Sequence, residues 1–126
     1  MSEISCDVIV IGAGPAGEVA AGRLADGGLE VVVVENHLVA GECSYYACMP
    51  SKALLRPGDL IDEARRIPGV KEAVTGDIDV ASALARRDEV IHDLDDSVQL
   101  PWLEDKGIRL VRGSGKLTGE KTVTAG

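Results

Sequence analysis

The chain has 126 residues, of which 13 are basic and 21 are acidic, so its formal net charge is −8. This negative balance disfavours non-specific binding to nucleic acid or to an anionic membrane surface. The length suits one small domain, and the sequence contains no apolar run long enough to span a bilayer. We therefore expect neither nucleic acid nor membrane as a partner.

A glycine-rich turn follows the first apolar segment. Residues 6–11 have the β-branched pattern of a strand buried in a parallel sheet, and residues 18–25 are expected to form a helix. Between them, Gly12 allows a tight turn, Gly14 lets the backbone approach a pyrophosphate, and Gly17 lets the helix pack close to the strand. The sequence therefore predicts a dinucleotide site with the phosphates at the helix N-terminus.

A second apolar segment, residues 31–34, ends in Glu35, eighteen residues after Gly17. An acid at this position can accept hydrogen bonds from a ribose hydroxyl. The alternative is a solvated strand end. The neighbouring Pro15, Ala16 and Asn36 are included in the predicted cofactor site.

Cys43 and Cys48 are separated by four residues. The pair could be two thiols without redox function, half of a metal site, or a reversible disulfide. Zinc sites need four ligands, usually in two close pairs, and Cys6, His37 and His92 do not provide them, so we expect no metal. Structural disulfides belong mainly to oxidising compartments, and no secretory signal is recognised. A redox-active pair in a cytoplasmic protein is the leading interpretation.

A helix is predicted to begin near Ser51, the expected N-cap residue. Cys48 would lie just before it, where the positive helix end and Lys52 favour a thiolate. Lys52 could instead be an ordinary solvated lysine. Tyr45 and Tyr46 lie between the two cysteines, where they either shape access to them or, as we favour, pack against the domain.

The remainder is interpreted as scaffold. Pro57-Gly58 is expected to kink or break the helix from Ser51. Asp79 is expected to cap a longer helix, interrupted near Pro101 and closed at Gly107. The glycine-separated strands that follow resemble a small antiparallel meander, and are predicted at residues 108–112, 114–117 and 122–124.

Three smaller expectations concern single residues. Cys6 is interpreted as a small buried apolar residue on the first strand. His92 is expected on the polar face of its helix. The clustered acids are interpreted as part of solvated helix faces: Asp93, Asp95, Asp96, Glu104 and Asp105.

The order and separation of these motifs resemble the N-terminal part of the flavoprotein disulfide reductases, a family that includes dihydrolipoamide dehydrogenase, glutathione reductase and mercuric reductase. The matching residues are Gly12-x-Gly14-x-x-Gly17, Glu35 and Cys43-x-x-x-x-Cys48-Met49-Pro50-Ser51-Lys52, and the motif-bearing match spans residues 6–56. The resemblance implies an α/β fold: an incomplete Rossmann-like FAD-binding domain, three-layered, with a parallel sheet and a small antiparallel β-meander. Residues 1–126 would be its N-terminal part, without the NAD(P)-binding and C-terminal dimerisation domains.

The resemblance also implies roles. FAD would be the cofactor, with NAD(P)H acting in the parent protein through a domain not present here. Cys43 would be the catalytic thiol that exchanges with substrate, and Cys48 the catalytic charge-transfer thiol that faces the flavin. The implied cofactor contacts are Gly12, Gly14, Pro15, Ala16, Gly17, Glu35, Asn36, Gly41, Glu42, Cys43, Cys48 and Lys52, of which Lys52 would lie near the reactive flavin nitrogen.

The implied function is electron transfer between nicotinamide, FAD, the cysteine pair and a small-molecule or protein disulfide or dithiol. The parent is expected to be a homodimer, and this fragment is expected to be inactive alone. The intervening Ser44, Tyr45, Tyr46 and Ala47 depart from the common Leu-Asn-Val-Gly, which weakens an assignment to lipoamide or glutathione. Two alternatives stay open: a nucleotide-binding module without redox-active cysteines, and a non-catalytic interaction fragment.

Overall fold

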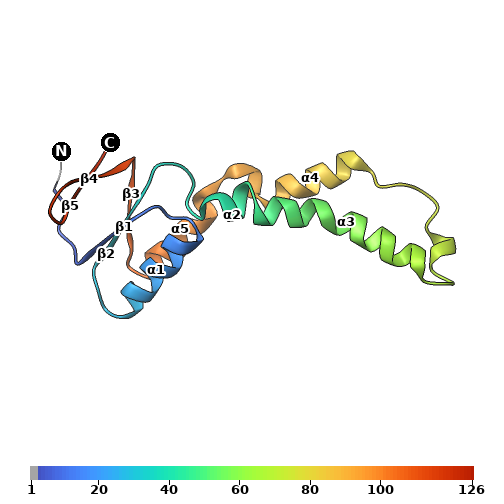
Figure 1. Cartoon of the computed structure of the whole chain (residues 1–126), viewed down its shortest axis with the longest axis horizontal. Coiled ribbons are helices and arrows are strands. Elements are labelled where there is room, and N and C mark those ends of the chain that lie inside the picture. The colour runs from blue at the N-terminus through green and yellow to red at the C-terminus, as the bar shows by residue number, and fades with distance from the viewer. Residues whose placement is uncertain (1–2) are drawn as a thin grey trace. The chain divides into compact units, whose positions relative to one another are not determined.

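The computed structural model describes residues 3–126, which form two compact units. Unit 1 comprises residues 3–43 and 95–126, and unit 2 comprises Ser44–Leu94. The boundary falls inside the short helix α2 (Gly41–Tyr45), between Cys43 and Ser44. The elements of both units are labelled in Figure 1, and each unit is described by itself.

Unit 1 contains a parallel three-stranded sheet. Its strands are β1 (Val8–Ile11), β2 (Val31–Glu35) and β3 (Arg109–Arg112), in the spatial order β1-β2-β3. Both pairings are parallel, with Val33 opposite Val10 on one side and Leu110 on the other. Every residue of β2 is buried, which agrees with its continuous apolar run. The first strand begins at Val8 rather than at Cys6.

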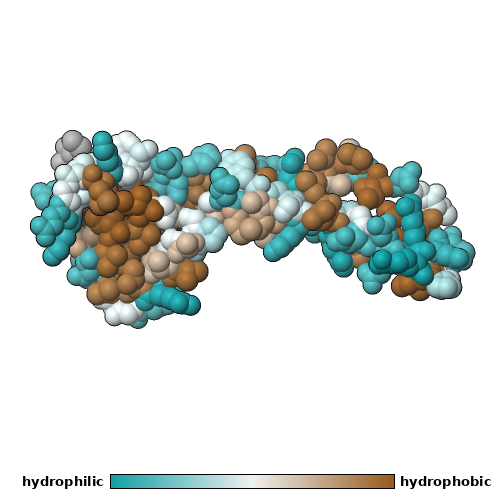
Figure 2. Space-filling view, in the orientation of Figure 1, coloured by the Kyte–Doolittle hydropathy of each residue, from teal (hydrophilic) through white to brown (hydrophobic). Residues whose placement is uncertain are grey.

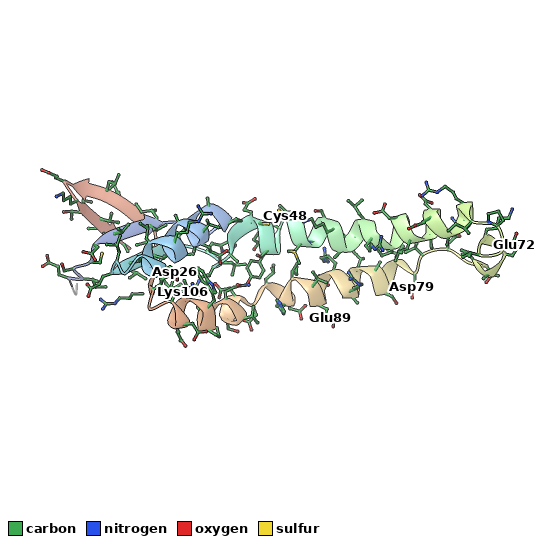
Figure 3. The ribbon with its side chains drawn as sticks, turned by 90° about the horizontal axis from the view of Figure 1, so that it is seen from below. Asp26, Cys48, Glu72, Asp79, Glu89 and Lys106 are labelled. Atoms are coloured by element: carbon green, nitrogen blue, oxygen red, sulfur yellow. The ribbon has the colours of Figure 1, made fainter. Side chains whose placement is uncertain are left out.

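Two helices pack against this sheet, α1 (Pro15–Asp26) and α5 (Leu100–Asp105). An ion pair joins them, with the Lys106 Nζ 2.5 Å from the Asp26 Oδ1 (Figure 3). The shared core contains small and branched apolar residues: Ala13, Ala21, Val31, Val33, Val39, Leu103 and Ile108.

The remaining strands form an antiparallel pair, β4 (Gly115–Gly119) and β5 (Thr122–Ala125). A parallel sheet accompanied by this small antiparallel pair confirms the predicted α/β class. The predicted three-stranded meander is wrong in one respect, because β3 pairs in parallel with β2. Leu110 of β3 packs against the core, so the parallel pairing with β2 covers the apolar side of this strand.

Unit 2 is built around a helical hairpin of α3 (Cys48–Arg66) and α4 (Val80–Val90), which pack on each other. The connection contains the 3-10 turn η1 (Lys71–Ala73). Two expectations about α3 are corrected: the helix starts at Cys48 rather than near Ser51, and it runs through Pro57 without a break. Pro57 removes a single backbone donor, so most of the hydrogen-bond ladder can persist around it.

The Asp79 cap is confirmed, since its side chain accepts a hydrogen bond from the Ser82 backbone N–H at 3.2 Å. The long helix expected beyond it is wrong. α4 ends at Val90 and is followed by the left-handed turn η2 (His92–Leu94), whose three residues have φ of 53°, 50° and 65°.

The chain then continues through the 3-10 turn η3 (Asp96–Gln99) into α5. Pro101 lies in the first turn of α5, where a missing N–H costs no helical hydrogen bond. Lys106 caps the end of α5, and Gly107 follows with φ of 67°, so the expected helix end at Gly107 is confirmed. Within residues 3–126, no helix has both the length and the apolar character needed to cross a membrane.

Candidate functional site

The glycine turn has the backbone geometry that its spacing predicts. Gly12 has φ of 97°, a conformation that favours glycine, and its N–H donates to the Val34 carbonyl oxygen at 2.7 Å. Gly14 is the N-cap residue of α1. A Cβ added at Gly17 would collide with the carbonyl oxygen of Gly12. The third glycine is therefore required for the close packing of α1 on the turn.

Glu35 is held beside this turn by hydrogen bonds from two backbone amides. One carboxylate oxygen accepts from the Ala13 N–H and the other from the His37 N–H, both at 2.7 Å. The side chain is buried, with the residue only 7% exposed, so the alternative of a solvated strand end is wrong. A carboxylate offers about four lone-pair sites, so two remain for other donors such as ribose hydroxyls.

The segment after β2 also packs against the glycine turn. The Ala40 N–H donates to the Ala13 carbonyl oxygen at 2.8 Å, and Ala40 and Gly41 have φ of 77° and 60°. A Cβ added at Gly41 would lie 2.7 Å from the Gly14 Cα. The structure thus brings Gly41 together with the turn, while Asn36 and Glu42 are exposed nearby in the chain.

Asp96 and Arg112 support this region, and sequence reasoning missed both. The Asp96 carboxylate accepts from the Val39 N–H at 2.7 Å and from two guanidinium nitrogens of Arg112 at 2.6 and 3.0 Å. Arg112 also donates to the His37 carbonyl oxygen at 2.9 Å. The hydrogen bond from Arg112 is the main reason that the pKa of Asp96 lies below its ordinary value.

Asp96 is therefore not a solvated helix-face acid, as expected from the acidic run, but a half-buried anchor for residues 37–39. Its neighbour Asp95 caps η3 by accepting from the Ser97 N–H at 2.9 Å. The signal that could have identified the anchor is an arginine at the end of β3, opposite Glu35 in the sheet.

The N-terminal end of α1 has the orphan backbone donors that can bind an anion. Pro15 and Ala16 open the helix and are exposed. Glu18 is the acidic residue of the first turn, and burial raises the pKa of its carboxyl group. An anion bound here would therefore meet a side chain that releases its proton less readily than a solvated glutamate.

The two cysteines belong to different units. Cys43 is on the unit 1 side of the boundary in α2. Cys48, labelled in Figure 3, is the first residue of α3 in unit 2. Each carries a thiol and is half-buried. Ser51 donates from its hydroxyl to the Cys48 carbonyl oxygen at 3.1 Å, which places it inside the helix rather than at its cap. Lys52 is exposed on the first turns of α3.

The tyrosines between the cysteines have different environments. Tyr45 is 2% exposed, which agrees with the favoured packing role, whereas Tyr46 is 49% exposed. Both line a cavity of about 480 Å³ in unit 2. The wall contributed by α4 includes an ion pair between the Arg87 Nε and the Asp88 Oδ1, at 2.6 Å.

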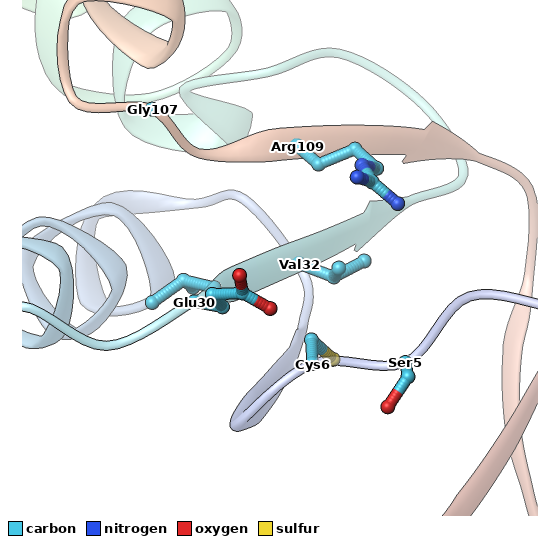
Figure 4. Close-up of a pocket in the computed structure, with 7 residues that line it drawn as sticks. Ser5, Cys6, Glu30, Val32, Gly107 and Arg109 are labelled. Atoms are coloured by element: carbon cyan, nitrogen blue, oxygen red, sulfur yellow. The ribbon is translucent and has the colours of Figure 1, made fainter.

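Cys6 lies elsewhere in unit 1, before the start of β1. It is half-buried, lies before β1 and lines a cavity of about 130 Å³ with Glu30 and Arg109 (Figure 4), so the expected buried position on the first strand is wrong. His92 is exposed in η2 rather than on a helix face. Across residues 3–126, no cluster of three or more histidine, cysteine, aspartate or glutamate side chains could hold a metal ion.

Comparisons with known proteins identify the family. The family model described as pyridine nucleotide-disulphide oxidoreductase matches residues 6–126. Dihydrolipoyl dehydrogenase from Vibrio cholerae is 36% identical over 96% of this chain and 26% of its own length. Dihydrolipoyl dehydrogenase from Halobacterium salinarum is 34% identical over 90% of this chain and 24% of its own length. Mercuric reductase from Lysinibacillus sphaericus is 27% identical over 98% and 23%.

The fold has a counterpart among solved structures. The Cu(II) complex of the HOCl-induced flavoprotein disulfide reductase RclA from Escherichia coli matches with a TM-score of 0.71 and 22% identity. That match covers 94% of this chain and 24% of the RclA chain, and at this identity it shows the fold alone. The chain thus spans about a quarter of the length of these relatives. It belongs to the pyridine nucleotide-disulphide oxidoreductase family.

Proposed function

We propose that this chain is the N-terminal part of an FAD-binding domain, and that it contributes a redox-active cysteine pair to an NAD(P)H-dependent disulfide oxidoreductase. The observation that carries the proposal is the arrangement around Glu35. Its buried carboxylate is fixed by the amides of Ala13 and His37, next to a glycine turn whose Gly17 leaves no room for a side chain. Such an arrangement suits a ribose and a pyrophosphate on adjacent parts of one ligand.

The residues of unit 1 fit the adenosine diphosphate part of FAD. Gly12, Gly14 and the first turn of α1 would hold the pyrophosphate, because their backbone approaches without a Cβ and donors point outward from the helix end. Glu35 would accept hydrogen bonds from the ribose. Gly41, which packs against Gly14, would line the same part of the cofactor site. When bound, the flavin supplies two-electron redox chemistry.

The cysteine pair would perform thiol–disulfide exchange. The Cys43 thiolate would attack an external disulfide, forming a mixed disulfide and releasing one external thiolate, which takes up a proton. The Cys48 thiolate would then attack the Cys43 sulfur and release the second external thiolate, which also takes up a proton. The substrate gains two electrons and two protons, and the Cys43–Cys48 pair loses them by becoming a disulfide.

Return to the dithiol needs two electrons and two protons, with reduced nicotinamide as the source in the parent protein. Lys52, in the early turns of the helix that begins with Cys48, would place a positive charge near that thiol. We expect the parent to be a homodimer with a disulfide or dithiol substrate, and this chain to bind nucleotide without turning over alone. The support is the family and the span of about a quarter of its members' length.

Thiol counting tests the redox pair directly. The chain is oxidised while folded and is then unfolded, so that every remaining thiol can react and be counted. The chain contains three cysteines, so after mild oxidation by glutathione disulfide it should present one reactive thiol, that of Cys6, and after reduction three. The variant Cys43→Ser lacks the attacking thiol and should keep both remaining thiols reactive after the same oxidation. The variant Cys48→Ser should stop at the mixed disulfide of Cys43 with glutathione, so only the Cys6 thiol stays reactive and one glutathione remains bound. Cys6→Ser is the control and should present none.

Three reactive thiols after oxidation of the folded chain would contradict the redox role. If such a chain still bound adenosine diphosphate, a nucleotide-binding module without redox-active cysteines would become the better interpretation. A chain that neither binds adenosine diphosphate nor forms the disulfide would favour the remaining alternative, a non-catalytic interaction fragment.

A further inference from the structure

Unit 2 contains a cavity that the proposed redox function does not use. Its volume is about 480 Å³, within the range of about 300–1,000 Å³ that is typical of small-molecule sites. Figure 2 shows apolar side chains beside hydrophilic ones over the α3–α4 hairpin, and the cavity lining has the same mixture. All of its lining residues belong to unit 2: Tyr45, Tyr46, Pro50, Arg87, Asp88, Ile91, Asp93 and Leu94.

One wall of the cavity is aromatic. Tyr45 is 2% exposed and Tyr46 is 49% exposed, so Tyr46 is the ring that a ligand can reach. Pro50, in the first turn of α3, is buried and continues this wall. The face of an accessible tyrosine ring attracts a cation as well as an apolar group.

The charged side chains of the lining leave one carboxylate without a counter-charge. Arg87 is paired with Asp88, with 2.6 Å between its Nε and the Oδ1. Asp93 takes part in none of the ion pairs found within residues 3–126. One guanidinium against two carboxylates leaves a single negative charge in excess, so the ligand that balances the lining carries one positive charge.

The unpaired carboxylate is held at the cavity by an unfavourable backbone turn. In η2, His92, Asp93 and Leu94 have φ of 53°, 50° and 65°. Left-handed backbone is uncommon for any residue other than glycine, and more so for leucine than for aspartate or histidine. Both Asp93 and Leu94 line the cavity. Unfavourable backbone of this kind is concentrated at ligand sites, which is a second and independent indication of a site here.

We propose that the unit 2 cavity binds an organic ammonium ion with an apolar body. The ammonium group would donate hydrogen bonds to the Asp93 carboxylate and face the Tyr46 ring, while the body lies against the aliphatic part of the lining. A neutral ligand would leave the carboxylate uncompensated, and an anionic one would be repelled by it. Binding at this cavity requires neither flavin nor a disulfide, so the site goes beyond the proposed function.

The test compares three probes that share a phenylethyl body and differ only in the polar group. 2-Phenylethylammonium carries the cation, 2-phenylethanol is neutral and 3-phenylpropionate is an anion. NMR titration of the whole chain should give a dissociation constant of about 1 mM or below for the ammonium, with shifts at the Tyr46 and Asp93 amides. The alcohol should bind at least about fourfold more weakly, because it lacks both the ion pair and the cation–π contact.

Two variants assign the recognition to single side chains. Asp93→Asn removes the charge but keeps a residue type that tolerates left-handed backbone, and should weaken ammonium binding about two- to fivefold. Tyr46→Leu should weaken it about two- to fivefold as well, through loss of the cation–π contact. In both variants the binding of the alcohol should change less than that of the ammonium. Circular dichroism of each variant establishes that the helices are retained.

The matched control is Asp105→Asn, at the exposed end of α5 in unit 1. It removes the same charge as Asp93→Asn from a chain whose net charge is −8, so it measures general attraction of a cation to an acidic protein. The dissociation constants of all three probes should be unchanged in this control, because its carboxylate is not part of the cavity.

Three outcomes would overturn the proposal. The first is the absence of amide shifts around the cavity up to ~10 mM 2-phenylethylammonium, well above the expected dissociation constant. The second is an alcohol or an anion that binds as tightly as the ammonium, which would assign binding to apolar contact or to Arg87. The third is an Asp105→Asn chain that loses as much affinity as Asp93→Asn. None of these results depends on flavin or on the cysteines, so the proposed redox function is tested separately.

Discussion

The replacement Glu35→Gln tests the role of the buried carboxylate beside the glycine turn. The glutamate accepts one hydrogen bond from the Ala13 N–H and one from the His37 N–H, each at 2.7 Å, and the residue is 7% exposed. Glutamine keeps one acceptor oxygen but presents an amide N–H₂ group to the other backbone donor. One bond is therefore lost and two donors face each other.

The cost follows from the charge of the acceptor. A hydrogen bond to a charged group contributes about 1.5–3 kcal/mol, and a buried donor left without a partner costs about 1–3 kcal/mol. Allowing for partial relaxation, we expect Glu35→Gln to lower the free energy of unfolding by about 2–4 kcal/mol. Affinity for adenosine diphosphate should also fall, because the ribose acceptor has lost its charge.

Urea denaturation followed by circular dichroism measures the first effect, and amide hydrogen exchange at Ala13 and His37 localises it. Exposed Glu120, in the turn between β4 and β5, supplies the matched control Glu120→Gln, which should change stability by less than about 0.5 kcal/mol. If Glu35→Gln left both the unfolding curve and the protection of the Ala13 amide unchanged, the carboxylate would not hold the turn.

Three further replacements have defined outcomes. Gly17→Ala should destabilise the chain by about 1–3 kcal/mol and weaken adenosine diphosphate binding, because the new Cβ collides with the Gly12 carbonyl oxygen; an unchanged melting curve would contradict the packing. Asp96→Asn should lower stability at neutral pH by about 1–3 kcal/mol through loss of the charged partner of Arg112. The pKa of Asp96 is lowered on folding, so its contribution to stability is full above the unfolded value of about 3.9 and is lost as the pH falls through the folded pKa. An Asp96→Asn variant with the same acid denaturation profile as the unaltered chain would contradict this contribution. Asp79→Ala should fray the start of α4, measurable as faster amide exchange in its first turn, and unchanged exchange there would show that the cap is dispensable.

Several features of the fold follow from the sequence, because a local pattern has a local physical cause. The turn at Gly12 requires a positive φ, and the third glycine at Gly17 removes a steric clash, so spacing alone predicts both. The run ending in Glu35 is a strand because both of its faces are covered by other residues. Asp79 comes directly before an apolar helical pattern, and its carboxylate can accept a hydrogen bond from a backbone N–H of the first turn. The whole cap signal therefore lies within four residues of the sequence.

The sequence pattern is insufficient where distant contacts decide the outcome. The strand at Arg109–Arg112 joins β2, more than seventy residues earlier, and nothing local distinguishes that partner from a neighbouring hairpin strand. The anchor formed by Asp96 and Arg112 also joins separate segments, so a run of acids gives no indication of which one pairs with the arginine.

The helix boundaries of unit 2 also differ from the local pattern. Proline usually ends or kinks a helix, yet α3 continues through Pro57, whose missing N–H removes only one donor from the helix. Conversely, α4 stops before His92, where three residues without a glycine take left-handed backbone angles. That conformation costs about 1–2 kcal/mol per residue, and no sequence pattern predicts it.

We propose that Cys43 and Cys48 form a redox pair coupled to a flavin bound beside Glu35. The visible absorption spectrum of the full-length protein that carries this chain, recorded during anaerobic two-electron reduction, tests this coupling. We expect a long-wavelength absorption band before the flavin bleaches, because the Cys48 thiolate would lie against oxidised flavin. Simple bleaching without that band would mean that the cysteines of this flavoprotein are not coupled to its cofactor.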